Sequence, residues 1–158
     1  LFVDLSTYVD DIDFVDLQGR PLQTLVEGES FFIRFVLKGL HAFKDPHVGF
    51  RIQDRLGLGM YETNTYCQGF PLEANLRNRS GPVTLIARCL NNLSQGEYSL
   101  AVGIEQEGYG LGAFRNVICP TKVVKTLTVV RDPLGTLWGG VSSLRPEFSC
   151  HDAQWLPA

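Results

Sequence analysis

One stretch of the sequence, residues 45–67, constrains the fold more than any other. Apolar side chains alternate with small or polar ones from Val48 to Gln53. This alternation is typical of a strand that buries one face. Residues 54–57 (DRLG) then favour a turn, and residues 59–66 are rich in the strand formers Thr and Tyr. The stretch therefore predicts a β-hairpin with a polar outer face.

The same two-residue period recurs along most of the chain. It is clearest in residues 30–40, where both faces are partly apolar and a central strand is expected, and in residues 97–106. Further strands are predicted at 8–16, 82–90 and 122–131, whereas residues 68–81 are interpreted as a long loop or bent edge. No stretch of ten residues has a helical period. About seven strands separated by turns predict an all-β, antiparallel β-sandwich.

The sequence divides into four parts. Residues 1–7 are interpreted as a linker or leader strand, 8–131 as the sandwich, 132–148 as a hinge and terminal strand, and 149–158 as a tail. The terminal strand is extended and apolar and must bury itself, either on its own domain or on a neighbouring one. Exchange of such a strand is a low-cost route to a symmetric dimer. The predicted dimer interface consists of Leu137, Trp138, Val141 and Leu144.

Charge and motifs argue against several classes of protein. A formal net charge of -3 argues against a nucleic-acid partner, and no apolar run is long enough to insert into a membrane. The four cysteines form no CxxC pair, so no metal site is expected, and we expect free thiols, with Cys119 in a loop before Pro120. No nucleophile elbow or phosphate-binding loop occurs, so no catalytic residue is predicted. The chain begins at Leu1 without a signal segment, and we expect it to be part of a longer polypeptide.

Polar side chains on two of the predicted strands suggest a binding surface. The outward positions of these strands also include Gly49, Ala101 and Gly103, which would leave a shallow trough if the strands share a sheet. Polar groups beside a trough, together with an aromatic ring, suit a sugar. The predicted carbohydrate-binding residues are Arg51, Gln53, Ser99, Glu105, Tyr109 (at the centre of a glycine-rich tip, 108–112) and Arg115. The alternative is that the small residues let a tail strand or partner chain pack on this face.

Six segments together resemble a known family. They are residues 12–19 (IDFVDLQG), 25–29 (LVEGE), 48–57 (VGFRIQDRLG), 60–65 (MYETNT), 96–100 (GEYSL) and 137–141 (LWGGV). The chain is similar, over residues 8–148, to the C-terminal carbohydrate-binding domain of Wzt-type ATP-binding subunits of O-antigen polysaccharide ABC transporters.

The resemblance implies an Ig-like sandwich that exchanges its last strand in a homodimer. It further implies a non-catalytic domain that recognises the capped non-reducing terminus of a lipid-linked O-antigen polysaccharide. No cofactor is implied in this domain, while ATP would bind to the presumed parent chain. The implied partners are the transporter's ATPase and membrane subunits, and the implied location is the cytoplasm, at the inner membrane. A protein-interaction or structural β-sandwich and a secreted adhesin-like domain are the alternatives.

Overall fold

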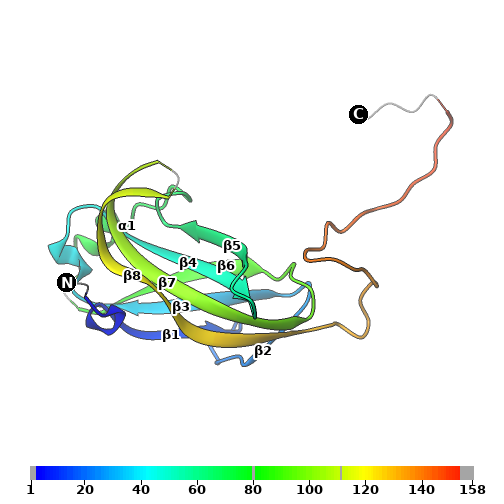
Figure 1. The fold of residues 1–158 in the computed structure, drawn as a ribbon, viewed down its shortest axis with the longest axis horizontal. Helices are drawn as coiled ribbons and strands as arrows, with labels where there is room; N and C mark the ends of the chain where they lie inside the picture. Colours follow the sequence, from blue (N-terminus) through cyan, green and yellow to red (C-terminus); the bar gives the residue numbers. More distant parts are fainter. Residues whose placement is uncertain (1–2, 80, 111, 154–158) are drawn as a thin grey trace.

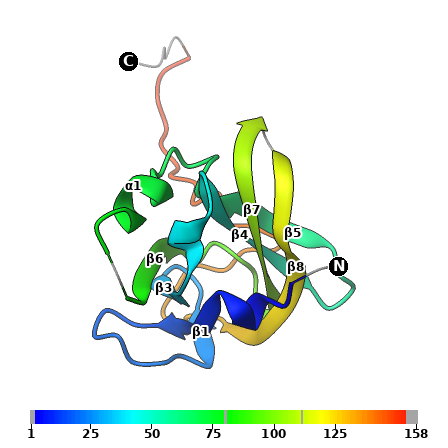
Figure 2. The same ribbon diagram turned by 90° about the vertical axis from the view of Figure 1, so that its left-hand side faces the viewer.

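The computed structural model describes residues 3–79, 81–110 and 112–153 and shows two packed β-sheets (Figures 1 and 2). One sheet has the strand order β1-β3-β6 and the other the order β2-β8-β7-β4-β5. The predicted all-β sandwich is thereby confirmed. The strands are β1 (Val9–Val15), β2 (Thr24–Val26), β3 (Ser30–Leu37), β4 (Pro46–Asp54), β5 (Gly59–Asn64), β6 (Val83–Leu90), β7 (Gly96–Gly110) and β8 (Ala113–Val130).

The smaller sheet is built around β3, as the sequence predicted. This strand pairs with β1 on one side and with β6 on the other, and both pairings are antiparallel. Its alternate residues point into the space between the sheets because successive side chains of a strand face opposite ways. Those residues are Phe31, Ile33, Phe35 and Leu37, all buried.

The larger sheet supplies the opposite wall of the core. Tyr98, Leu100, Val102 and Ile104 of β7 are buried, in agreement with the predicted inward set. β7 and β8 form a hairpin much longer than the predicted strands, and β8 alone runs over 18 residues. The sheet is not wholly antiparallel, because β2 pairs with β8 in a parallel orientation.

The predicted hairpin of residues 45–67 is present as β4 and β5. Asp54 closes the turn, because its Oδ1 accepts hydrogen bonds from the backbone N–H groups of Leu56 and Leu58, both at 2.9 Å. Gly57 has φ = 83°, a conformation that side-chain-bearing residues rarely adopt. The turn chemistry of this segment therefore fixes the register of the hairpin.

Three local predictions need correction. Residues 1–7 contain a short 3-10 helix, Leu5–Thr7, whose Leu5 belongs to the hydrophobic core. The predicted loop at 68–81 contains the helix α1 (Leu72–Leu76), in which two leucines four residues apart are buried against the sandwich. Cys119 lies within β8 and not in a loop, because β8 begins well before the predicted strand, and its side chain is buried.

The tail after β8 leaves the sandwich as an extended segment (Figure 1). No strand is assigned in its described part, 131–153, and a single β-bridge joins Ser142 to Leu93. Of the predicted interface residues, Leu137, Val141 and Leu144 are exposed and Trp138 is half-buried. In this single chain the apolar tail does not form the predicted terminal strand.

Candidate functional site

The two strands of the predicted trough lie side by side in the larger sheet. Arg51 pairs with Ala101, and Gln53 with Ser99, across β4 and β7. The Arg51 guanidinium donates hydrogen bonds to Gln53 Oε1 at 3.2 Å and to the Gly57 carbonyl oxygen at 3.1 Å. These two bonds hold the half-buried Arg51 side chain against its own hairpin, beside the polar side chains of Gln53 and Ser99.

The small residues between these strands do not form an open floor. Ala101 and Gly103 are both buried, contrary to the prediction. At Gly103 the cause is an irregularity in the β7–β8 pairing, whose register shifts between Val102 and Ile104 of β7. The shift brings Thr121 against Gly103, where a Cβ atom would lie only 2.7 Å from the threonine Oγ1. Gly103 is therefore a site of close strand packing.

The remaining predicted residues lie at the far end of the same sheet. Glu105 is six residues from Ser99 along β7, a separation of about 20 Å at 3.3 Å per residue. Tyr109 is 69% exposed, and Arg115 is exposed on β8. Burial raises the pKa of Glu105, whose neighbours across the sheet are His47 and Val117. The structure thus separates the six residues into two groups of three.

A buried histidine links β4 to the end of β5, and the sequence did not identify it. The Nδ1 atom of His47 is 2.8 Å from Thr65 Oγ1, and its Nε2 atom is 2.9 Å from Asp45 Oδ1. The Thr65 hydroxyl oxygen also accepts a hydrogen bond from the Val48 N–H. Because a carboxylate oxygen can only accept, the neutral imidazole donates to Asp45 from Nε2, and Nδ1 then accepts from the Thr65 hydroxyl. This network fixes the segment that follows β5.

Two aromatic rings cover this histidine. Tyr66 and Phe114 lie with ring centroids 5.5 Å and 6.0 Å from the His47 ring and 6.0 Å from each other. Gly108 allows this arrangement, since a Cβ atom there would lie 2.7 Å from the Tyr66 ring. The glycine next to Tyr109, which we interpreted as a sign of a flexible tip, is instead required for close packing. Leu111, in the same predicted tip, lies outside the described residues.

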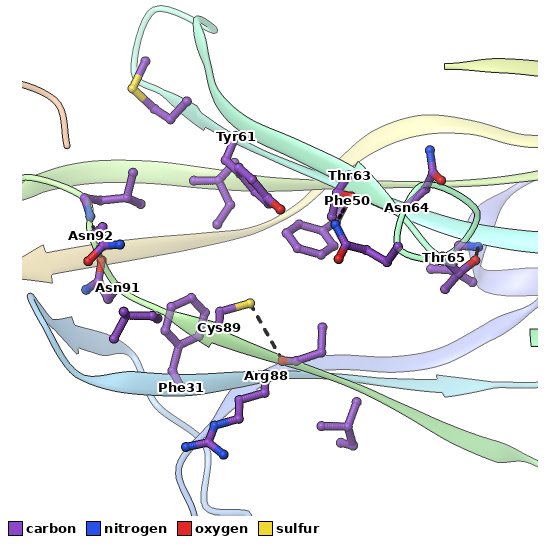
Figure 3. A pocket seen from close by; sticks show the side chains of 18 of the residues that line it. Phe31, Phe50, Tyr61, Thr63, Asn64, Thr65, Arg88, Cys89, Asn91 and Asn92 are labelled. Atoms are coloured by element: carbon purple, nitrogen blue, oxygen red, sulfur yellow. Dashed lines mark hydrogen bonds between the residues drawn. The ribbon is translucent and has the colours of Figure 1, made fainter. Parts of the chain in front are cut away.

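A slot of about 570 Å³ opens between the two sheets (Figure 3). It lies between the edge strands β5 and β6, and one wall carries Phe50 and Tyr61 while the opposite wall carries Phe31 and Cys89. Thr63, Asn64 and Thr65 lie toward one end, and Asn91 and Asn92 lie at the other. We refer to this cavity as the slot. Its size falls within the range of small-molecule sites, which are also mainly apolar with a few polar groups.

Edge strand β6 explains why the slot is open. Among the described residues β6 pairs with β3 alone, so the backbone of its other edge has no strand partner. Its inward side chains, including Leu85 and Ala87, stay half-exposed where a central strand would bury them. Alternation predicted β6 correctly but could not show that it lies at an edge, since this depends on the pairing of distant strands.

Two groups in the slot are chemically distinctive. Burial raises the pKa of the Cys89 thiol to about 11, so the thiol is protonated near neutral pH. Asn92 Oδ1 is buried without a hydrogen-bond partner in the described structure. All four cysteines are free, as the sequence predicted.

The described residues contain no group of three or more His, Cys, Asp or Glu side chains arranged to hold a metal ion. Likewise, within the described part of the chain, no helix has the length and apolar character needed to cross a bilayer.

The two packed sheets and the largely apolar slot at their edge define an all-β sandwich domain. The model of the Wzt C-terminal domain family matches residues 4–138, and the chain belongs to that family. A crystal structure of the C-terminal domain of Wzt superposes with a TM-score of 0.61 at 18% identity, covering 90% of this chain and 83% of that one. The family predicted from the sequence is confirmed. The name of this family describes a C-terminal domain and no catalytic activity.

A second solved structure is similar only in part. It is the CARDB domain of a Pyrococcus furiosus protein in complex with di-metal ions, with a TM-score of 0.33 and 9% identity, covering 78% of this chain and 90% of that one. No curated protein matches the sequence.

Proposed function

We propose that this chain is a non-catalytic carbohydrate-binding domain that recognises the capped non-reducing terminus of a lipid-linked O-antigen polysaccharide. In this proposal it belongs to the ATP-binding subunit of an ABC transporter, acts in the cytoplasm at the inner membrane, and signals that a glycan is ready for export. The observation that carries the proposal is the match to the Wzt C-terminal domain family over residues 4–138.

The outer face of the larger sheet is the proposed glycan surface. Arg51, Gln53 and Ser99 supply hydrogen-bonding groups at one end. Glu105, Tyr109 and Arg115 lie at the other end, where the exposed Tyr109 ring offers a face to the C–H groups of a sugar. The two ends are about 20 Å apart along the strands, so a ligand that contacts both must be an oligosaccharide. An arginine at each end also suits an acidic cap.

Calorimetry with capped and uncapped polysaccharide from the same source tests this function. Binding to the capped chain alone supports recognition of the terminus, and equal binding to both refutes it. The variant Arg51→Ala should weaken binding at least about tenfold, the effect of losing a charged hydrogen bond of about 1.5–3 kcal/mol. Arg55→Ala is the matched control, because Arg55 is an exposed arginine at the tip of the same hairpin.

The proposed assembly is a homodimer in which residues 136–144 of each chain add to the free edge of β6 in the other. Two observations support it: among the described residues one edge of β6, beside the slot, has no strand partner, and Leu137, Val141 and Leu144 are exposed in the tail. A strand in this position would satisfy the free backbone groups of β6 and place apolar side chains in the slot.

The free edge of β6 also favours a second candidate function, the binding of an extended peptide from a different protein. Strand addition needs a free sheet edge and pockets for alternate side chains. In the described structure β6 supplies the edge, and the slot beside it supplies the pocket. A domain that binds no glycan but captures such a peptide at β6 would support this function in place of the first.

A further inference from the structure

The tail of the chain contacts its own sandwich through a short segment, residues 141–145, in addition to the Arg131–Glu27 ion pair where the tail begins. The Ser143 N–H donates to the Asn92 carbonyl oxygen at 3.0 Å, and Ser142 forms a β-bridge with Leu93. Two residues later the Arg145 guanidinium donates to the Gly28 carbonyl oxygen, also at 3.0 Å. These contacts join the tail to the β6–β7 and β2–β3 connections, which are far apart in sequence.

This segment lies at one end of the slot. Val141 and Ser142 belong to the slot lining, together with Asn91, Asn92 and Leu93. Asn92 lies at this end of the slot, and its Oδ1 atom is buried without a hydrogen-bond partner in the described structure (Figure 3). The tail therefore borders the slot at its polar end.

The closed position of the segment depends on few interactions. Arg145 has φ = 51°, which is unfavourable for an arginine and is retained only while its contacts hold it. Leu144 within the segment is exposed, as are Gly140 before it and Pro146 after it, so none of these three residues adds a buried contact. A segment held by a few surface hydrogen bonds opens far more easily than the core does.

We propose that residues 141–145 form a latch that closes this end of the slot, and that release of the latch increases access to Cys89 from this end. The Ser143–Asn92 and Arg145–Gly28 hydrogen bonds hold it shut. The proposal concerns contacts within one chain. Residues 141–144 cannot form the latch and pair with β6 of another copy at the same time, so the closed latch and the exchanged strand are alternative states of the tail. The latch does not depend on glycan recognition.

Cys89 provides a native reporter of access. Its thiol lines the slot, while Cys67 has similar half-burial but lies outside the slot lining. Cys150 is exposed and should be labelled fast, whereas Cys119 is buried and should be labelled slowly. The labelling rate of Cys89 can be compared with both.

The test is pulse labelling of the whole chain with N-ethylmaleimide, read cysteine by cysteine by mass spectrometry. Ser143→Pro removes the donated N–H, and Arg145→Ala removes the guanidinium. Each variant should raise the Cys89 rate roughly fivefold, the equilibrium factor for the loss of one net hydrogen bond, while Cys67 and Cys119 keep their rates. Arg55→Ala, at an exposed arginine on the β4–β5 turn, should leave all four rates unchanged.

Two labelling results in the variants would overturn the latch, and a third would come from dilution of the wild type. One is an unchanged Cys89 rate in both variants, and the other is a parallel rise at Cys89, Cys67 and Cys119, which would show general loosening of the sandwich. The labelling is repeated over a hundredfold range of protein concentration. A wild-type Cys89 rate that rises on dilution would show that a second copy, and not the latch, covers the slot. A rate independent of concentration, together with the fivefold rise in the variants, supports the latch whether or not the domain binds glycan.

Discussion

Replacing Gly108 with alanine tests the packing at the end of the larger sheet. The added Cβ atom would lie 2.7 Å from two carbons of the Tyr66 ring and 3.1 Å from the Phe114 ring. Contacts this short require at least one ring to move. Tyr66 has little freedom to do so, because it packs edge-on against both His47 and Phe114.

The expected loss of stability follows from these contacts. Overpacking a tight site costs about 1–3 kcal/mol, and loss of one aromatic pair costs about 0.5–1.5 kcal/mol. We therefore expect Gly108→Ala to lower the free energy of unfolding by about 2 kcal/mol, measured by urea denaturation followed by circular dichroism. Since Tyr109 is the next residue in β7, glycan binding should weaken as well.

Gly110 is the matched control two residues further along the strand. A Cβ atom there would lie 3.6 Å from the Ala113 Cβ, an ordinary contact, so Gly110→Ala should be neutral or stabilising by up to about 1 kcal/mol. Tyr66→Leu in the Gly108→Ala background should recover at least about 1 kcal/mol of the loss relative to simple additivity. Equal stability of the two alanine variants would refute the argument for close packing at Gly108.

Four further predictions concern the core, the site, the tail and the edge. Phe35→Ala should lower the free energy of unfolding by about 3–5 kcal/mol in urea denaturation, because the ring is fully buried between the sheets. The pKa of Glu105 is raised by burial, so its ionisation destabilises the fold as pH rises above its unfolded value. Glu105→Gln should therefore gain stability relative to wild type between pH 4 and 7, and an equal difference at both pH values would contradict this. Ending the chain before Thr136 should give a monomer, or insoluble protein, by analytical ultracentrifugation, whereas a soluble dimer would exclude the exchanged strand. Arg88→Val, which removes a charge from the exposed face of β6, should increase concentration-dependent light scattering without reducing thermal stability.

The fold could be predicted because alternation and turn chemistry are local. A buried face of β3 can be predicted from alternation alone, whichever strands pair with it; its residues are Phe31, Ile33, Phe35 and Leu37. The turn at residues 54–57 can likewise be predicted from those four residues. Helix α1 was missed because its five residues are too few for a helical period to be visible.

The candidate site was harder to predict because it depends on contacts between distant residues. The sequence placed Arg51 and Gln53 beside Ser99 correctly, since both strands alternate without interruption there. It failed at Gly103, because the shift in β8 that covers it with Thr121 depends on how two strands pair. The slot lies between the edges of two different sheets, and no local pattern encodes such a gap.

The free edge of β6 has a consequence for the order in which the chain is made. β6 can pair with β3 as soon as both have been synthesised, but the tail proposed to cover its other edge follows roughly 45 residues later. At 5–20 residues per second this leaves the edge bare for about 2–9 s on every nascent chain. Neighbouring chains on one polysome present the same bare edge close together. The interval in which this free edge is most exposed to mispairing thus falls before synthesis of the tail is complete.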